Sequence, residues 1–182
     1  AVKMGTTVAT NALLELDGAK TLFLVSQGCG DILHIGDQTR ADLFALKIEK
    51  PAPLPGRIVE VSGRLDSEGE EIEPLDAGPL RTALSRARED GFEAVAIALL
   101  HSYRNDRHER AVEALAKEAG FEHIICSADA SPLIKLVPRA STAVIDAYLT
   151  PVLRRYVKRV RDGLGKTPLY FMQSSGGLAN AD

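Results

Sequence analysis

The residues Gly5, Thr6 and Thr7 form the first short segment whose types and spacing could bind an anion. Glycine permits a tight turn, and a threonine oxygen can accept a backbone N–H that the first turn of a helix leaves unpaired. Apolar residues at helical spacing follow from Val8 to Leu16, and Gly18 is expected to end the helix. The start of such a helix offers free N–H groups, two hydroxyls and the positive end of the helix dipole to a phosphate or a carboxylate. An ordinary capped helix that binds nothing is the alternative interpretation.

A second polar segment begins at His101 and follows the most apolar stretch of the chain, residues 93–100. An apolar stretch with so little alternation is typical of a central parallel strand that is covered on both faces. Open α/β sheets bind their ligands beyond the carboxyl ends of such strands. The segment therefore lies where a ligand site is expected.

This segment also contains side chains that can bind metals, namely His101, His108 and Glu109. His108 and Glu109 are neighbours on an expected helix and point in different directions, so no metal site is predicted. Glu109 is instead expected to cap the helix together with Asp106, because the two have the spacing of a capping box. His101 is expected to be a hydrogen-bonded structural residue.

A glycine-rich turn, Ser174-Ser175-Gly176-Gly177, follows a short expected strand over residues 168–173. Two glycines in such a place let backbone N–H groups approach an anion closely. Many turns of this kind are purely structural, so the pattern alone leaves both interpretations open.

The composition is that of an ordinary globular protein, with 182 residues, 45% of them hydrophobic and 26% charged. A net charge of −3 gives no reason to expect nucleic acid, and the basic residues between 154 and 161 are expected to form a solvated helix face. No apolar run reaches the roughly 18 residues of a membrane span. Cys126 is expected in the core, and Cys29 could be exposed. Their spacing supports neither a metal site nor a disulfide. A cytoplasmic location is therefore expected.

The order of the expected elements predicts an α/β fold with a mostly parallel sheet flanked by helices. Residues 93–126 are expected to form a βαβ unit, and residues 50–75 a proline-rich connector followed by a small β-hairpin. We expect a single α/β domain over residues 1–182, with residues 168–182 starting a following segment. Because the chain stops just after an apparent strand and turn, it is expected to be an excised piece of a longer polypeptide.

Two further expectations concern the C-terminal part of the chain. Residues 127–139 are expected to form a loop, and a long helix is expected from Ser141. Pro151 lacks an N–H, so the helix is expected to kink there or to restart with Thr150 as its cap.

Four separated segments together resemble the A-type chains of the hydantoinase/oxoprolinase family. They are the Gly-Thr-Thr helix of residues 5–14, the His-Ser-Tyr segment of residues 101–109, the helix of residues 141–156 and the turn of residues 172–178. The resemblance implies an actin/hexokinase-like ATPase lobe in an enzyme that uses ATP and Mg²⁺ to hydrolyse small cyclic amides such as hydantoins or 5-oxoproline. It also implies two partners for this chain, the rest of the same polypeptide and a B-type subunit.

The resemblance leaves the catalytic residues unknown but implies candidates for binding substrate or phosphate. They are Gly5, Thr6, Thr7, Thr10, Asn11, His101, Tyr103, Asn105, Arg139, Ser174, Ser175, Gly176 and Gly177.

Some features depart from the family pattern. Asp37 replaces a typical arginine, and residues 133–138 lack acidic residues that relatives usually carry, so no acid/base or metal role is expected for that loop. Further glycine-rich phosphate loops of such enzymes are missing, so the isolated chain is expected to bind no cofactor and to have little or no activity. The alternatives are a piece of the nucleotide-binding subunit of a ketone carboxylase, and a non-catalytic interaction module of the same fold.

Overall fold

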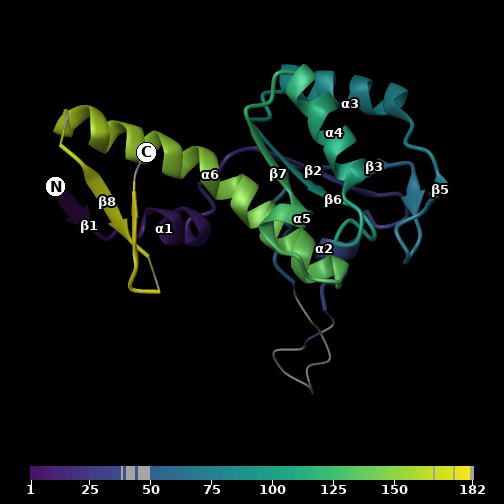
Figure 1. Cartoon of the computed structure of the whole chain (residues 1–182), viewed down its shortest axis with the longest axis horizontal. Coiled ribbons are helices and arrows are strands. Elements are labelled where there is room, and N and C mark those ends of the chain that lie inside the picture. Colours follow the sequence, from purple (N-terminus) through teal and green to yellow (C-terminus); the bar gives the residue numbers. More distant parts are fainter. Residues whose placement is uncertain (38, 40–43, 45–49, 166, 174, 181–182) are drawn as a thin grey trace. The chain divides into compact units, whose positions relative to one another are not determined.

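The computed structural model describes the chain except residues 38, 40–43, 45–49, 166, 174 and 181–182 (Figure 1). The chain divides into two compact units. The larger unit comprises Lys20–Tyr148, and the smaller unit combines Ala1–Ala19 with Leu149–Asp182. The candidate residue Ser174 lies outside the described residues.

A four-stranded parallel sheet lies at the centre of the larger unit. Across the sheet, its strands are β3 (Arg57–Val61), β2 (Thr21–Ser26), β6 (Ala94–Ala98) and β7 (His123–Cys126). Every residue of β2 and β6 is buried. This confirms the α/β fold with a central apolar strand, because strands covered on both faces need no polar alternation.

Helices α3 (Ala77–Glu89) and α4 (Arg107–Glu118) contact each other and bury their apolar stripes in the core of this unit. Asp76 caps α3, since its Oδ1 accepts the N–H of Gly78 at 3.0 Å. The expected βαβ unit is confirmed, because β6 and β7 are adjacent and parallel with α4 between them in the chain. The shared core includes Leu24, Leu84, Phe92, Ile97 and Val112.

Within residues 50–75, which are predicted to form only a connector and a β-hairpin, Arg57–Val61 instead form β3 of the parallel sheet. The hairpin is shorter than expected and pairs β4 (Arg64–Leu65) with β5 (Glu71–Glu73) in antiparallel fashion. Asp66 closes its turn, because its Oδ1 accepts the N–H groups of Glu68 and Glu70, both at 2.9 Å. All three residues of β5 are exposed, as expected for an edge of this charge.

The expected loop over residues 127–139 is wrong at both ends, because helices occupy them. The short helix α5 (Ser127–Ala130) directly follows β7, and α6 (Leu136–Leu164) begins before Ser141. The start of α6 accepts Pro138 because the first turn of a helix leaves its N–H groups without helical partners. Another short helix, α2 (Ile32–Ile35), follows β2.

Helix α6 continues through Pro151, so the expected restart at Thr150 is wrong. Pro151 is buried, and apolar packing offsets the hydrogen bond that a proline cannot donate. None of the helices over the described residues has the length and apolar character that a membrane span requires.

The smaller unit contains a three-stranded sheet with the order β1 (Val2–Met4), β8 (Leu169–Met172) and β9 (Leu178–Asn180). β1 and β8 are parallel, whereas β8 and β9 form an antiparallel hairpin. Helix α1 (Val8–Leu14) ends well before Gly18, and Leu16 adopts a φ of 55° with 70% of its surface exposed. The expectation that Leu16 belongs to the apolar face of this helix is therefore wrong, because the chain leaves the helix before reaching it.

Candidate functional site

The two glycine-containing candidate segments follow neighbouring strands of the small sheet. Met4 of β1 is in register with Phe171 of β8, and the two strands are parallel. Gly5 follows β1 directly, and the turn from Gln173 to Gly177 follows β8. Because parallel strands end at the same edge, both segments leave the sheet on the same side. We call this place the small-sheet edge.

The Gly-Thr-Thr segment of this edge is open to solvent. Gly5, Thr6 and Thr7 are exposed, and a Cβ added at Gly5 would meet no atom within 4 Å. The Oγ1 of Thr6 accepts the N–H of Val8 at 3.2 Å, whereas Thr7, the N-cap residue of α1, makes no capping hydrogen bond with its side chain. Thr6 therefore supplies the predicted cap. The hydroxyl of Thr7 is not used in capping and is available to bind another group.

Two further candidates, Thr10 and Asn11, lie on α1 and are exposed. The turn on the other side of the edge is a β-hairpin turn. The Gly176 N–H donates to the Gln173 carbonyl at 2.9 Å, and the Gln173 N–H donates to the Gly177 carbonyl at 2.8 Å. Gly176 has a φ of 84°, a conformation that glycine adopts without strain.

The candidates His101, Tyr103 and Asn105 lie in the loop between β6 and α4 of the larger unit. His101 adopts a φ of 60°, and its carbonyl accepts the N–H groups of Arg104 at 2.9 Å and Asn105 at 3.1 Å. Its ring lies 6.2 Å from the ring of Tyr103. The buried Nδ1 of His101 has no hydrogen-bond partner among the described residues, so the expected hydrogen-bonded role is not fulfilled at this atom.

Asn105, rather than Glu109, caps α4. The Oδ1 of Asn105 accepts the N–H of Arg107 at 3.1 Å, and its Nδ2 donates to the Gly69 carbonyl at 2.8 Å. Asp106 makes no capping hydrogen bond with its side chain. The predicted capping box is therefore wrong, and Asn105 instead joins the helix start to the hairpin between β4 and β5.

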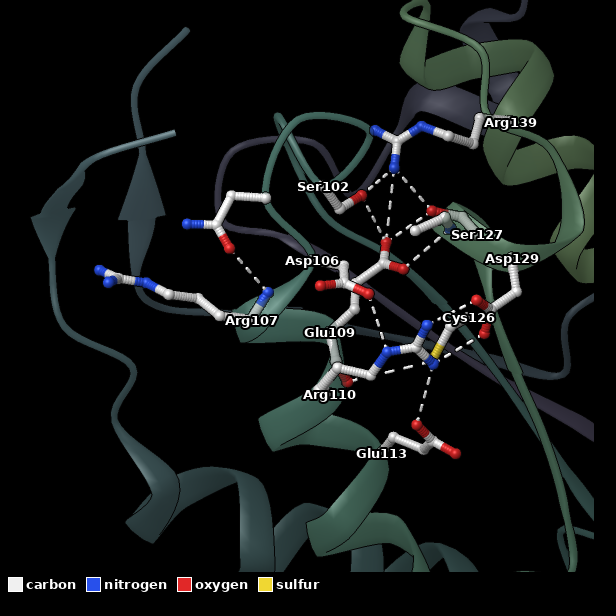
Figure 2. Close-up of polar contacts among 12 residues, drawn as sticks. Ser102, Asp106, Arg107, Glu109, Arg110, Glu113, Cys126, Ser127, Asp129 and Arg139 are labelled. Atoms are coloured by element: carbon white, nitrogen blue, oxygen red, sulfur yellow. Dashed lines mark hydrogen bonds and ion pairs between the residues drawn. The ribbon is translucent and has the colours of Figure 1, made fainter. Parts of the chain in front are cut away.

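Glu109 points into the interior, where it meets Arg139 (Figure 2). Its Oε1 accepts hydrogen bonds from the Ser102 hydroxyl at 2.7 Å, the Ser127 hydroxyl at 2.5 Å and the Leu99 N–H at 2.9 Å. Its Oε2 accepts the Ala128 N–H at 3.0 Å. The carboxylate therefore joins the end of β6 to the start of α5.

Arg139, from the first turns of α6, completes this buried network. Its Nη1 lies 3.5 Å from the Oε1 of Glu109 and donates to the hydroxyls of Ser127, at 2.7 Å, and Ser102. Its Nη2 donates to the Leu99 carbonyl at 2.7 Å. Burial lowers the pKa of the Arg139 guanidinium, and the negative charge of Glu109 opposes this effect. Because the side chain is fully enclosed, Arg139 positions loops rather than contacting a ligand.

A second, exposed network surrounds Arg110 on the outer side of α4 (Figure 2). Arg110 binds both oxygens of Asp129, at 2.7 and 2.5 Å, and also reaches Asp106 at 2.8 Å and Glu113 at 3.2 Å. The hydrogen bonds from Arg110 lower the pKa of Asp129. Asp129 is therefore an ion-pair partner on the surface.

Sequence reasoning missed Ser102, Ser127 and the true role of Glu109. The available signal was a charged residue at a position that the helical apolar pattern places inward, as for Glu109 beside Val112 on α4. A buried charge requires a partner, and Arg139 is the matching cation. No group of three His, Cys, Asp or Glu side chains suited to a metal ion occurs over the part of the chain that the structure describes.

Comparison with known proteins gives the family. The sequence profile of the hydantoinase/oxoprolinase N-terminal region matches residues 1–120, and the hydantoinase/oxoprolinase profile matches residues 139–182. The chain belongs to the hydantoinase/oxoprolinase family. This confirms the resemblance that the four sequence segments indicated.

Curated members of the hydantoinase/oxoprolinase family match almost the whole chain. It is 40% identical to 5-oxoprolinase 1 of Arabidopsis thaliana, covering 98% of this chain and 16% of that protein. It is 36% identical to caprolactamase subunit alpha of Pseudomonas jessenii, covering 96% of this chain and 26% of that protein. The chain therefore spans only about a sixth to a quarter of the length of these relatives.

Solved structures of two proteins share its fold. ATP-dependent caprolactamase from Pseudomonas jessenii matches with a TM-score of 0.81 and 34% identity, over 97% of this chain and 27% of that one. Acetone carboxylase in its nucleotide-free form matches with a TM-score of 0.78 over 99% of this chain and 28% of that one, at 22% identity. These likenesses confirm the α/β fold class of the actin-like ATPases.

Proposed function

We propose that the chain is part of a longer ATP-dependent hydrolase that acts on small cyclic amides. The observation that carries this proposal is the 40% identity to a 5-oxoprolinase over 98% of the chain. The caprolactamase likeness supports it, because caprolactam and 5-oxoproline are both cyclic amides and that enzyme is ATP-dependent. The rest of the polypeptide and a B-type subunit are the proposed partners, and the cytoplasm is the proposed location.

We assign the contact with a phosphate group of ATP to the small-sheet edge. Thr7 and the start of α1 follow β1 at this edge, and the turn containing Gly176 and Gly177 follows β8. Phosphorylation by ATP turns an amide into a better electrophile, and hydrogen-bond donors stabilise the charge that develops on the phosphoryl group. The described residues contain no carboxylate cluster for Mg²⁺, so we assign it no ligand in this chain.

A ketone carboxylase subunit is the second candidate function. The fold likeness to acetone carboxylase favours it, although at 22% identity this likeness concerns the fold alone. Both candidates consume ATP, so only the co-substrate separates them.

Phosphate release from ATP by the native-length protein with its B-type subunit tests the proposal. We expect stimulation by 5-oxoproline or hydantoin, whereas stimulation only by acetone with bicarbonate would make the protein a carboxylase. Stimulation by none of them would refute both candidates. A Thr7→Val variant should raise the KM for ATP, while the matched Thr142→Val variant, whose hydroxyl donates to the Pro138 carbonyl in the larger unit, should not. The isolated 182-residue chain is expected to release no phosphate.

A further inference from the structure

A groove on the smaller unit lies between the C-terminal half of α6 and the β8–β9 hairpin, with a volume of about 690 Å³. Apolar and cationic side chains share its lining, together with Asn180 and the carboxylate of Asp162. The apolar members are Leu153, Val157 and Phe171, and the cationic members are Arg154, Lys158 and Arg161. We call this feature the α6 groove.

The cationic character of the α6 groove is not explained by the helix alone. Cations stabilise the last turn of a helix through its dipole, but this effect fades within that turn. Arg154 lies more than two turns before the end of α6 at Leu164. The charged side chains that line the groove are mostly positive, whereas the chain as a whole has a formal net charge of −3. Its lining therefore suits an apolar side chain flanked by carboxylates.

The chain itself carries such a segment in the β4–β5 hairpin. Ile72 is 67% exposed at the centre of β5, with Glu71 and Glu73 beside it in the chain. Glu68 and Glu70 on the same hairpin are exposed as well. Asp66 holds the turn in shape, so the segment is pre-organised for binding and loses little entropy on association.

We propose that the acidic β4–β5 hairpin of one copy of the chain docks into the α6 groove of a second copy. Ile72 enters the apolar part of the groove, and the carboxylates that flank it along the hairpin face Arg154 and Lys158. Each copy carries one hairpin and one groove, so the contact joins two or more copies of the chain. This inference does not depend on the proposed enzymatic activity.

Sedimentation velocity of the native-length protein tests the contact. We expect the average mass to rise as the concentration increases from low to high micromolar, and to fall when the salt is raised to about 0.5 M, where charges are screened within a few ångströms. The Arg154→Glu/Lys158→Glu and Glu70→Lys/Glu73→Lys variants should each associate at least about tenfold more weakly, because like charges then face each other. A protein that remains monomeric at high concentration and low salt overturns the proposal.

Mixing these two charge-reversed variants gives the decisive result. In the mixture, the unchanged hairpin of one variant meets the unchanged groove of the other, and the reversed groove meets the reversed hairpin. The mixture should therefore associate more strongly than either variant alone. The Lys3→Glu/Lys135→Glu variant is the matched control for the groove, since both lysines are exposed elsewhere. Glu15→Lys/Asp17→Lys is the control for the hairpin, because these residues flank Leu16, which is 70% exposed. If the mixture stays dissociated while far-UV circular dichroism shows both variants folded, or if a control loses association equally, the proposal is wrong.

Discussion

Arg139 and Glu109 form an ion pair in which neither side chain is exposed, with 3.5 Å between Nη1 and Oε1. Two hydroxyls, two backbone N–H groups and one carbonyl satisfy most of their remaining hydrogen-bonding groups. The pair therefore joins the end of β6, the start of α4, α5 and the first turns of α6. Through Ser102, the pair also contacts the loop that contains His101 and Tyr103.

Removing one partner of this ion pair should lower the free energy of unfolding more than replacing both partners by apolar residues. A Glu109→Gln variant leaves the Arg139 charge buried without a counter-charge, so it should lower the free energy of unfolding by about 3–5 kcal/mol. The Glu109→Leu/Arg139→Met variant removes both charges and should recover much of that loss, because apolar residues can replace a buried ion pair. Urea unfolding of the chain followed by circular dichroism measures both values. Equal loss in the two variants would show that packing, and not the uncompensated charge, sets the cost.

The local elements of the fold could be predicted from sequence, because each rests on a nearby signal. The apolar run of β6, the cap at Asp76 and the turn around Asp66 are all of this kind. The pairing of Met4 with Phe171 could not be predicted, since it joins opposite ends of the chain and β1 is only three residues long. Nor could the role of Arg139, which depends on where β7 and α5 place Ser127.

Among the candidate site residues, too, some roles could be predicted from the sequence and others could not. The sequence indicated that the Gly-Thr-Thr segment caps a helix, and Thr6 does so. The sequence also indicated that Asp106 and Glu109 cap α4. In the structure Asn105, one residue before Asp106, makes the capping hydrogen bond. The Glu109 side chain points into the interior instead. Capping propensities alone cannot separate these alternatives, because both Asn and Asp are good caps.

Replacing Gly69 tests the contact between the β4–β5 hairpin and the loop that precedes α4. Its φ is +91°, and an added Cβ would lie 3.1 Å from the Cβ of Asn105. A Gly69→Ala variant therefore suffers both backbone strain and crowding and should lose about 2 kcal/mol of stability. Gly91→Ala is the matched control, because Gly91 has a φ of +80° with no atom within 4 Å of the added Cβ, and it should lose about 1 kcal/mol. Urea unfolding compares the two, and equal losses would show that Asn105 yields without cost.

The surface network of Arg110 should make stability depend on acid pH. The pKa of Asp129 lies below its ordinary value of 3.8, because Arg110 hydrogen-bonds the charged form. A lowered carboxyl pKa stabilises the folded state above the ordinary value, and this contribution disappears as the pH falls through the lowered one. An Arg110→Gln variant should be less stable by about 1 kcal/mol at neutral pH, since these side chains are partly exposed. The difference from the native chain should shrink below pH 3.8 in urea titrations, whereas a pH-independent difference would contradict this assignment.

The two cysteines should react at different rates with iodoacetamide. Burial, reinforced by the charge of Glu109, raises the pKa of Cys126 to about 12, and its side chain is enclosed in the core. Burial also raises the pKa of Cys29, but this residue is only partly buried. Because the thiolate is the reactive form, we expect slow labelling of Cys29 in the folded chain, faster at higher pH, and labelling of Cys126 only after unfolding. Peptide mass spectrometry identifies the modified residue, and the Cys29→Ser chain, as control, should take up no label while folded. Labelling of Cys126 at the rate of Cys29 would mean that the contact between β7 and α4 opens readily in solution.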